Sequence, residues 1–153
     1  MRIGPVQQES TRASLVEILQ WIDKSPILAA SAGLTTALVA VVADGVIQGA
    51  SVGDSEAWLV SDTDDRVLTE GQNRKPLVGS RRCAPVAFGP VPMRGTLVLG
   101  SDGLFKYCPR DVLLGIARSS NLDAIPEQLV SASQLPSGRL HDDLTVLVCR
   151  EAT

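Results

Sequence analysis

The stretch Leu97-Val98-Leu99-Gly100-Ser101-Asp102-Gly103-Leu104 decides how we interpret this chain. Its three consecutive apolar residues predict a short buried strand that ends at Gly100 and Ser101. Asp102 follows directly, and Gly103 lets the backbone turn sharply after it. A carboxylate placed in this way stands at the rim of a rigid sheet. Asp-Gly after a strand is also typical of a hairpin turn. Whether Asp102 belongs to a functional site or to a simple turn therefore depends on the pattern in the rest of the chain.

Length and composition exclude several classes of protein. The 153 residues suffice for one domain with a sizeable core, and we take residues 1–153 as a single domain. Hydrophobic residues make up 44% and charged residues 20%, as is usual for a soluble globular chain. The net charge of −3, without a block of lysine or arginine, argues against nucleic acid or an anionic membrane as a partner. No apolar run approaches the roughly 20 residues that span a bilayer.

The cysteines and the first residues bear on the compartment. Residues 1–10 have no apolar core of the signal-peptide type. Cys83, Cys108 and Cys149 are widely spaced and form no pair motif. An odd number of cysteines in a chain that is not exported indicates reduced thiols, so we expect a cytoplasmic protein.

The first half of the chain predicts one helix followed by strands. Apolar residues recur at helical spacing over residues 8–24. Leu34 to Ala43 is nearly all apolar, which predicts a strand buried on both faces. Asp44-Gly45 is the strongest short signal for a hairpin, so this part of the sheet should be antiparallel. Further extended segments are predicted at 46–52, 57–60 and 66–69, with a turn at 61–65.

The second half combines a long loop, the strand 96–100 and two helices. Residues 70–95 contain eight glycines and prolines, which argues against long elements there. Pro109 suits the start of a helix over about 109–118, and Asp123 should cap another over about 124–134. A turn at 136–138 and a final strand at 144–149 complete an α+β layered domain.

Three aspartates lie beside predicted strands: Asp54, Asp102 and Asp142. Clustered carboxylates raise one another's pKa unless a cation lies between them. Mg²⁺ and Mn²⁺ prefer oxygen ligands, and two such ions about 3.5–4 Å apart can bind a phosphate and generate a hydroxide nucleophile. We expect Asp102 and Asp142 to share a metal with Asp54 nearby, and Asp143 to point away. The single histidine, His141, has no obvious nucleophile partner and should face solvent.

Four segments occur in an informative order: Gly33-Leu34-Thr35-Thr36-Ala37-Leu38, Ala50-Ser51-Val52-Gly53-Asp54-Ser55, Ser101-Asp102-Gly103-Leu104 and Asp142-Asp143-Leu144-Thr145-Val146. Together they resemble the PPM family, the type 2C metal-dependent serine/threonine protein phosphatases, in a short bacterial form. The resemblance covers about residues 33–150, and the helix 8–24 precedes it. It implies a layered α-β-β-α sandwich of two antiparallel sheets with outer helices.

The resemblance also implies a site and an activity. Asp102 and Asp142 would be catalytic ligands of a dinuclear Mg²⁺ or Mn²⁺ centre, and Asp54 would bind a third ion. The segment 70–95 would correspond to the variable flap beside the site. The substrate would be a phosphoprotein, dephosphorylated at serine or threonine.

The chain departs from the family pattern at its N-terminus. The family carries a phosphate-binding arginine and an Asp-Gly-x-Gly-Gly motif whose aspartate bridges the two metals, and residues 1–32 contain neither. Asp44-Gly45 lies in a hairpin and is a poor substitute, and Glu56 stands where many members have arginine. We therefore expect an N-terminally truncated fold with exposed sheet edges, at which a partner chain can add.

Two hypotheses remain open from the sequence. One is a protein phosphatase that is incomplete in this chain, which would then be weak or inactive alone. The other is a catalytically inactive phosphatase-like module that binds a partner protein.

Overall fold

The computed structural model describes residues 5–26 and 33–151. Two compact units form, Met1–Ser55 with Thr69–Pro92 and Glu56–Leu68 with Met93–Thr153, which we call the first and second units. The first contains α1 (Pro5–Asp23), β1 (Ala37–Ala43), β2 (Val46–Val52) and β5 (Val86–Pro92). The second contains β3 (Glu56–Val60), β4 (Asp65–Val67), β6 (Thr96–Gly100), α3 (Asp102–Phe105), α4 (Arg110–Ala117), the 3₁₀ helix η1 (Leu122–Ala124), α5 (Ile125–Ala132) and β7 (Val146–Arg150).

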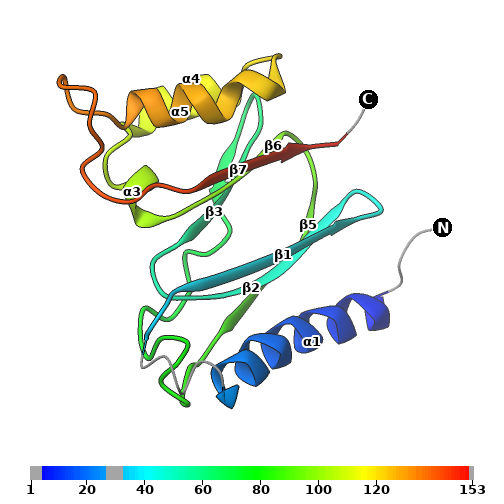
Figure 1. The fold of residues 1–153 in the computed structure, drawn as a ribbon. Coiled ribbons are helices and arrows are strands. Elements are labelled where there is room, and N and C mark those ends of the chain that lie inside the picture. The colour runs from blue at the N-terminus through cyan, green and yellow to red at the C-terminus, as the bar shows by residue number, and fades with distance from the viewer. Residues whose placement is uncertain (1–4, 27–32, 152–153) are drawn as a thin grey trace. The chain divides into compact units, whose positions relative to one another are not determined.

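Each unit contains one antiparallel sheet. The strand order is β1-β2-β5 in the first unit and β4-β3-β6-β7 in the second, and every pairing of these strands is antiparallel (Figure 1). The predicted α+β class with two antiparallel sheets is therefore confirmed.

The predicted hairpin forms in the first unit. Ala43 pairs with Val46, and Asp44 and Gly45 between them have φ angles of 49° and 71°. Two left-handed residues make a turn whose twist matches that of the flanking strands. The expectation that β1 is buried on both faces is wrong, because β1 is an edge strand and Val41 and Val42 are 37% and 43% exposed.

Helix α1 packs on this sheet (Figure 1). Leu15 and Leu19 bury their side chains against Ala50 of β2, as the predicted apolar stripe requires. At the end of α1, the Asp23 carboxylate is only 2% exposed and accepts hydrogen bonds from the backbone N–H groups of Gly79 and Arg81 at 2.7 and 3.0 Å. The segment that contains Gly79 and Arg81 is thus tied back to the helix.

Residues 70–95 were expected to lack long elements, and this is wrong because β5 lies within them. The strand pairs with β2, with a shift of register between Ile47 and Gly49. Proline is tolerated in β5 because it is an edge strand. Gly49 makes room for the ring of Phe88, since a Cβ on Gly49 would lie 2.0 Å from the Phe88 ring.

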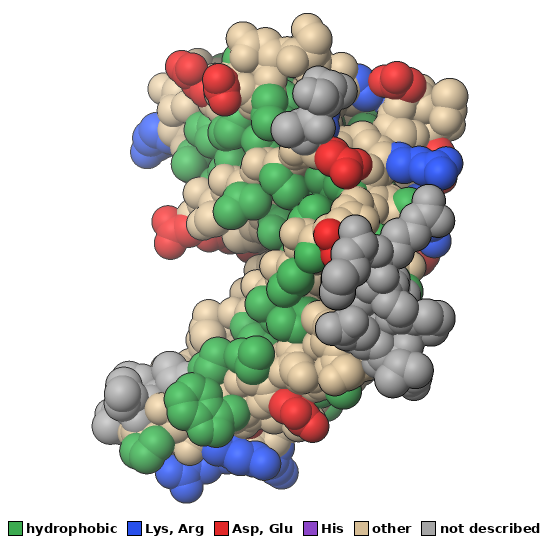
Figure 2. All heavy atoms as spheres, turned by 90° about the vertical axis from the view of Figure 1, so that its right-hand side faces the viewer, with side chains coloured by type: hydrophobic (Ala, Val, Ile, Leu, Met, Phe, Trp, Pro, Cys, Tyr) green, Lys and Arg blue, Asp and Glu red, His purple; other side chains and the backbone are tan. Residues whose placement is uncertain are grey.

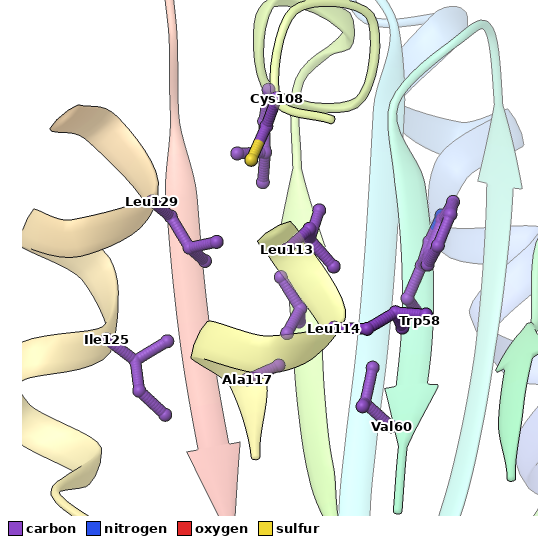
Figure 3. Packing of buried hydrophobic residues seen from close by; sticks show 10 residues of the cluster. Trp58, Val60, Cys108, Leu113, Leu114, Ala117, Ile125 and Leu129 are labelled. Carbon is purple, nitrogen blue, oxygen red and sulfur yellow. The ribbon is translucent and has the colours of Figure 1, made fainter. Parts of the chain in front are cut away.

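Helices α4 and α5 cover one face of the second sheet (Figure 3). Both helices fall where they were predicted, but Asp123 lies in η1 and does not cap α5, which begins after Ala124. The cluster between helices and sheet is mainly aliphatic, as the shortage of aromatic residues requires. Its buried members are Trp58, Val60, Val98, Leu104, Cys108, Leu113, Leu114, Ala117, Ile125 and Leu129.

Hydrophobic side chains also reach the surface, as Figure 2 shows on one face of the molecule. Among the described residues, Leu147 of the edge strand β7 is 54% exposed. Such edges carry unpaired backbone N–H and C=O groups that can accept another strand. None of the helices that the structure describes combines the length and apolar character needed to cross a membrane.

Candidate metal centre

Asp102 follows β6 as predicted, but the local structure differs from the expected turn. Asp102 begins the short helix α3, after Ser101 in an extended conformation. Gly103 is a buried residue of that helix and has no positive φ. A glycine is needed at this position because the backbones of Gly103 and Asp143 lie close together. A Cβ on Gly103 would lie 2.3 Å from the carbonyl oxygen of Asp143. Both the sharp turn and the alternative hairpin are therefore wrong.

The segment that carries Asp142 is fastened beside Asp102. The Ser101 N–H donates to the Thr145 carbonyl at 3.1 Å, and the Thr145 N–H donates to Ser101 Oγ at 2.9 Å. Ser101 Oγ in turn donates to the Asp143 carbonyl at 3.2 Å. One serine next to Asp102 thus bonds to two of the three residues that follow Asp142.

One oxygen of Asp142 is already oriented. Its Oδ1 accepts a hydrogen bond of 2.9 Å from the Asp143 N–H. The side chain is exposed, so its other oxygen is accessible to a ligand. Asp143 takes part through its backbone, and whether its carboxylate points away stays a prediction.

The pKa of Lys106 is affected by the charges of both Asp102 and Asp142. The pKa of its ammonium group is raised, first by a hydrogen bond and charge from Tyr107, and further by the negative charges of Asp102 and Asp142. Both carboxylates therefore act on the same ammonium group. His141 is exposed, as expected, but its ring stacks on that of Tyr107 with centroids 4.3 Å apart.

Asp54 lies in the first unit, after β2. The preceding Gly53 has a φ of 111°, and a Cβ on it would lie 2.5 Å from Thr36 Cγ2. Thr36 Oγ1 and Ser55 Oγ are hydrogen-bonded at 2.9 Å, which explains why the Thr-Thr segment accompanies this turn. Asp54 belongs to a different unit from Asp102 and Asp142, so its nearness to them stays a prediction.

The carboxylates of Asp102 and Asp142 supply only part of the ligands that a divalent ion such as Mg²⁺ takes. Among the described residues, no group of three or more His, Cys, Asp or Glu side chains is arranged to hold a metal. Mg²⁺ is usually bound by one or two carboxylates and keeps several waters. The chemistry of Asp102 and Asp142 therefore fits one hydrated divalent ion. A second ion would need further donors, and whether Asp54 supplies one stays a prediction.

A second group of charged residues in the same unit was missed from the sequence. Glu56 accepts a hydrogen bond of 2.6 Å from Trp58 Nε1, and the Arg110 guanidinium lies over the Trp58 ring at 4.5 Å while pairing with Asp65. Trp58 also stacks on Phe105 of α3, with centroids 5.2 Å apart. Glu56 therefore positions a core aromatic residue, and no motif signals this.

Several solved structures are similar to almost the whole chain. A bacterial serine phosphatase shares 20% sequence identity over 99% of this chain and 70% of its own, with a TM-score of 0.75. The serine/threonine phosphatase Stp1 of Staphylococcus aureus shares 19% over 100% and 71%, with a TM-score of 0.74. The PPM Ser-Thr phosphatase of Mycobacterium smegmatis, solved with cacodylate, shares 18% over 95% and 73%, with a TM-score of 0.65. This chain has the fold of the PPM phosphatases.

The PPM fold was expected from four short segments of sequence. The structural similarity is not limited to those segments but covers almost the whole chain. The sequence matches no protein-family model and no curated protein. At these identities the likeness shows the fold, and the chain spans about 70% of the length of the bacterial serine phosphatase. Within the PPM fold, the hydrogen bonds of Ser101 join the start of α3, which carries Asp102, to the loop that carries Asp142.

Proposed function

We propose that this chain forms part of a metal-dependent phosphatase that hydrolyses phosphoserine and phosphothreonine in proteins. The observation that carries the proposal is that Asp102, at the start of α3, and Asp142, in the loop before β7, lie on adjoining segments at one end of β6 and β7, in a chain with the PPM fold. Mg²⁺ or Mn²⁺ is the proposed ion, because both accept carboxylate oxygens. Three free thiols support a cytoplasmic location.

Asp102 and Asp142 are the proposed metal ligands, and Asp54 is the proposed ligand of a third ion. A bound divalent ion would polarise a phosphoryl oxygen and lower the pKa of a coordinated water. The Asp143 N–H holds one oxygen of Asp142 and so restricts the rotation of that carboxylate. The Lys106 ammonium, whose pKa the negative charges of both aspartates help to raise, would attract the phosphate dianion.

We infer that these 153 residues bind metal weakly and turn over little substrate by themselves. The sequence has no Asp-Gly-x-Gly-Gly segment, so the bridging carboxylate of a two-metal centre has no counterpart in it. Loss of a bridging ligand affects both the nucleophile and the orientation of the phosphate.

The test combines Mn²⁺ calorimetry with turnover of a phosphothreonine peptide. Asp102→Asn and Asp142→Asn should each abolish the weak Mn²⁺ binding, whereas Asp123→Asn, at an exposed position of the same unit, should leave it unchanged. Addition of an N-terminal segment with the Asp-Gly-x-Gly-Gly motif should raise turnover, and this gain should require Asp102.

Two results would change the proposal. Robust turnover by the 153 residues that Asp102→Asn abolishes would show that the bridging role is filled from within the chain. No turnover after addition of the segment would favour the alternative function, a phosphatase-like module that binds a partner protein through an exposed sheet edge.

A further inference from the structure

A pocket with a volume of about 490 Å³ lies in the second unit, away from Asp102. Thr96 of β6 pairs with Arg150 of β7 at this end of the sheet, and Gly100 pairs with Val146 at the end that leads to Asp102. The two ends of β6 are thus separated by the length of a five-residue strand, about 13 Å. The charged side chains that line the pocket are Asp62, Arg94, Arg118 and Arg150, and the hydroxyl groups come from Ser61, Thr63 and Thr96.

Positive charge dominates this lining. Three arginines face the pocket against a single aspartate, Asp62. Within the described residues, the ion pair between Arg110 and Asp65 is the one salt bridge found, so Asp62 forms no close ion pair with any of the three. Like charges gathered in one concave site repel each other and favour the binding of an anion.

Two of the guanidinium groups are held in place by the protein. Arg150 donates from Nε and Nη2 to Thr96 Oγ1 at 3.0 and 2.6 Å, and from Nη2 to the carbonyls of Ala117 and Ser119 at 3.1 and 2.8 Å. Arg118 donates from Nε to the Ser61 carbonyl at 2.8 Å. In the described part of the chain, Nη1 of Arg150 and both terminal nitrogens of Arg118 have no hydrogen-bond acceptor.

A structural role explains only part of this arrangement. Arg150 stabilises the carbonyl end of α4, where a cation is favourable. That role does not require Arg94, which is exposed in the loop before β6, nor the free fork of Arg118. Guanidinium groups with unpaired terminal nitrogens match the oxygens of a phosphoryl group, to which they can donate two hydrogen bonds at once.

The backbone around the pocket is closely fitted. Gly95 has a φ of 118°, and a Cβ on it would lie 2.2 Å from the Val60 carbonyl oxygen. The Ser61 N–H donates to the Asp64 carbonyl at 2.8 Å, and Ser61 Oγ accepts from the Asp64 N–H at 2.9 Å. The loops that carry Ser61 and Arg94 are therefore fixed where they meet the pocket.

We propose that this pocket binds a phosphoryl group, separately from the candidate metal centre. Arg94 and Arg118 donate to its oxygens from the rim, Arg150 contributes from the floor, and the Thr63 hydroxyl is a further donor. The inference does not depend on phosphatase activity, because it concerns other residues at the opposite end of β6.

The test is an NMR titration of the full 153-residue chain with inorganic phosphate, in buffer without divalent metal. We expect saturable shifts of the backbone amides in residues 61–64, 94–96 and 118–119. Arg94→Gln and Arg118→Gln should each weaken the apparent affinity about tenfold, since each removes a charged donor. Unchanged spectra elsewhere will show that these surface variants fold.

Two further experiments test the specificity of the binding and the source of the phosphoryl group. Arg139→Gln removes an exposed arginine outside the pocket and should leave the affinity unchanged. A phosphothreonine peptide that competes at the same amides would identify a phosphorylated protein as the ligand. If only inorganic phosphate binds, the ligand is a free phosphate or a small phosphoester. Shifts that do not saturate, or that Arg139→Gln reduces as much as Arg118→Gln, would overturn the proposal.

Discussion

Gly103 packs directly against the backbone of Asp143, so that a Cβ on Gly103 would lie 2.3 Å from the Asp143 carbonyl oxygen. The contact joins the first turn of α3 to the loop that carries Asp142. No side chain can be added at Gly103 unless that loop moves. The distance between the two proposed metal ligands is thus set partly by a residue that has no side chain.

Gly103→Ala should destabilise the protein by about 1–3 kcal/mol, because the methyl group overlaps backbone that cannot rotate away. Urea unfolding followed by tryptophan fluorescence measures this loss. Gly115→Ala is the matched control, since Gly115 lies in α4 and a Cβ there meets nothing within 4 Å. That control should stabilise by roughly 0.5–1 kcal/mol, as expected for alanine in place of glycine inside a helix. Equal effects of the two variants would contradict the close contact.

Gly53→Ala should lower the free energy of unfolding by more than the positive φ of Gly53 alone explains. Its φ of 111° disfavours any side chain, and its Cβ would also lie 2.5 Å from Thr36 Cγ2. Gly138→Ala isolates the first effect, because Gly138 has a φ of 79° and an open surrounding. We expect a loss of roughly 1 kcal/mol for Gly138→Ala and a clearly larger one for Gly53→Ala, measured by urea unfolding. Similar losses would show that the Thr36 contact relaxes easily.

Some elements could be predicted because one local signal sufficed. The hairpin at Asp44-Gly45 needs only two residues with positive φ, and the sequence supplies residues that adopt it. Strand β6 is a short apolar run that ends at glycine, and its bounds match the prediction. The positions of α4 and α5 follow from their apolar spacing and from Pro109.

Other features depend on contacts that no local pattern contains. Strand β5 carries glycine and two prolines, and only its pairing with β2 makes it a strand. The exposure of Val41 and Val42 follows from the edge position of β1, which periodicity does not reveal. At the candidate site, the sequence places Asp102 and Asp142 beside strands, but the role of Ser101 in joining the segments that carry them appears only in three dimensions.

Cys83 should be the least reactive of the three thiols. Burial, together with the negative charge of the nearby Asp23 carboxylate, raises its pKa to about 11. Burial also raises the pKa of Cys149, but that side chain is less well covered. Since the thiolate is the reactive form, iodoacetamide at mildly alkaline pH should modify Cys149 first and Cys83 last, as read by peptide mass spectrometry. In denaturant all three should react alike, and modification of native Cys83 as fast as Cys149 would refute the expected order.

Asp23→Asn should reveal an ionised carboxylate that stabilises the first unit. Burial by itself raises the pKa of Asp23, but the N–H groups of Cys83, Gly79 and Arg81 lower it, and the net result lies below the ordinary value of 3.8. Asparagine has one acceptor oxygen where the carboxylate has two, so at least one buried N–H loses its acceptor. The expected loss at neutral pH is about 1–3 kcal/mol.

The pH dependence separates this charge effect from simple misfit. Because the folded-state pKa of Asp23 is lowered, its contribution is fully present above 3.8 and is lost as the pH falls through the folded-state pKa. The free energies of unfolding of wild type and Asp23→Asn should therefore converge below pH 3.8. Denaturant unfolding at a series of pH values measures the difference, and Asp123→Asn, at an exposed position, should change little at any pH. A gap between wild type and Asp23→Asn that stays constant down to the lowest pH would mean that the three hydrogen bonds do not depend on the ionised carboxylate.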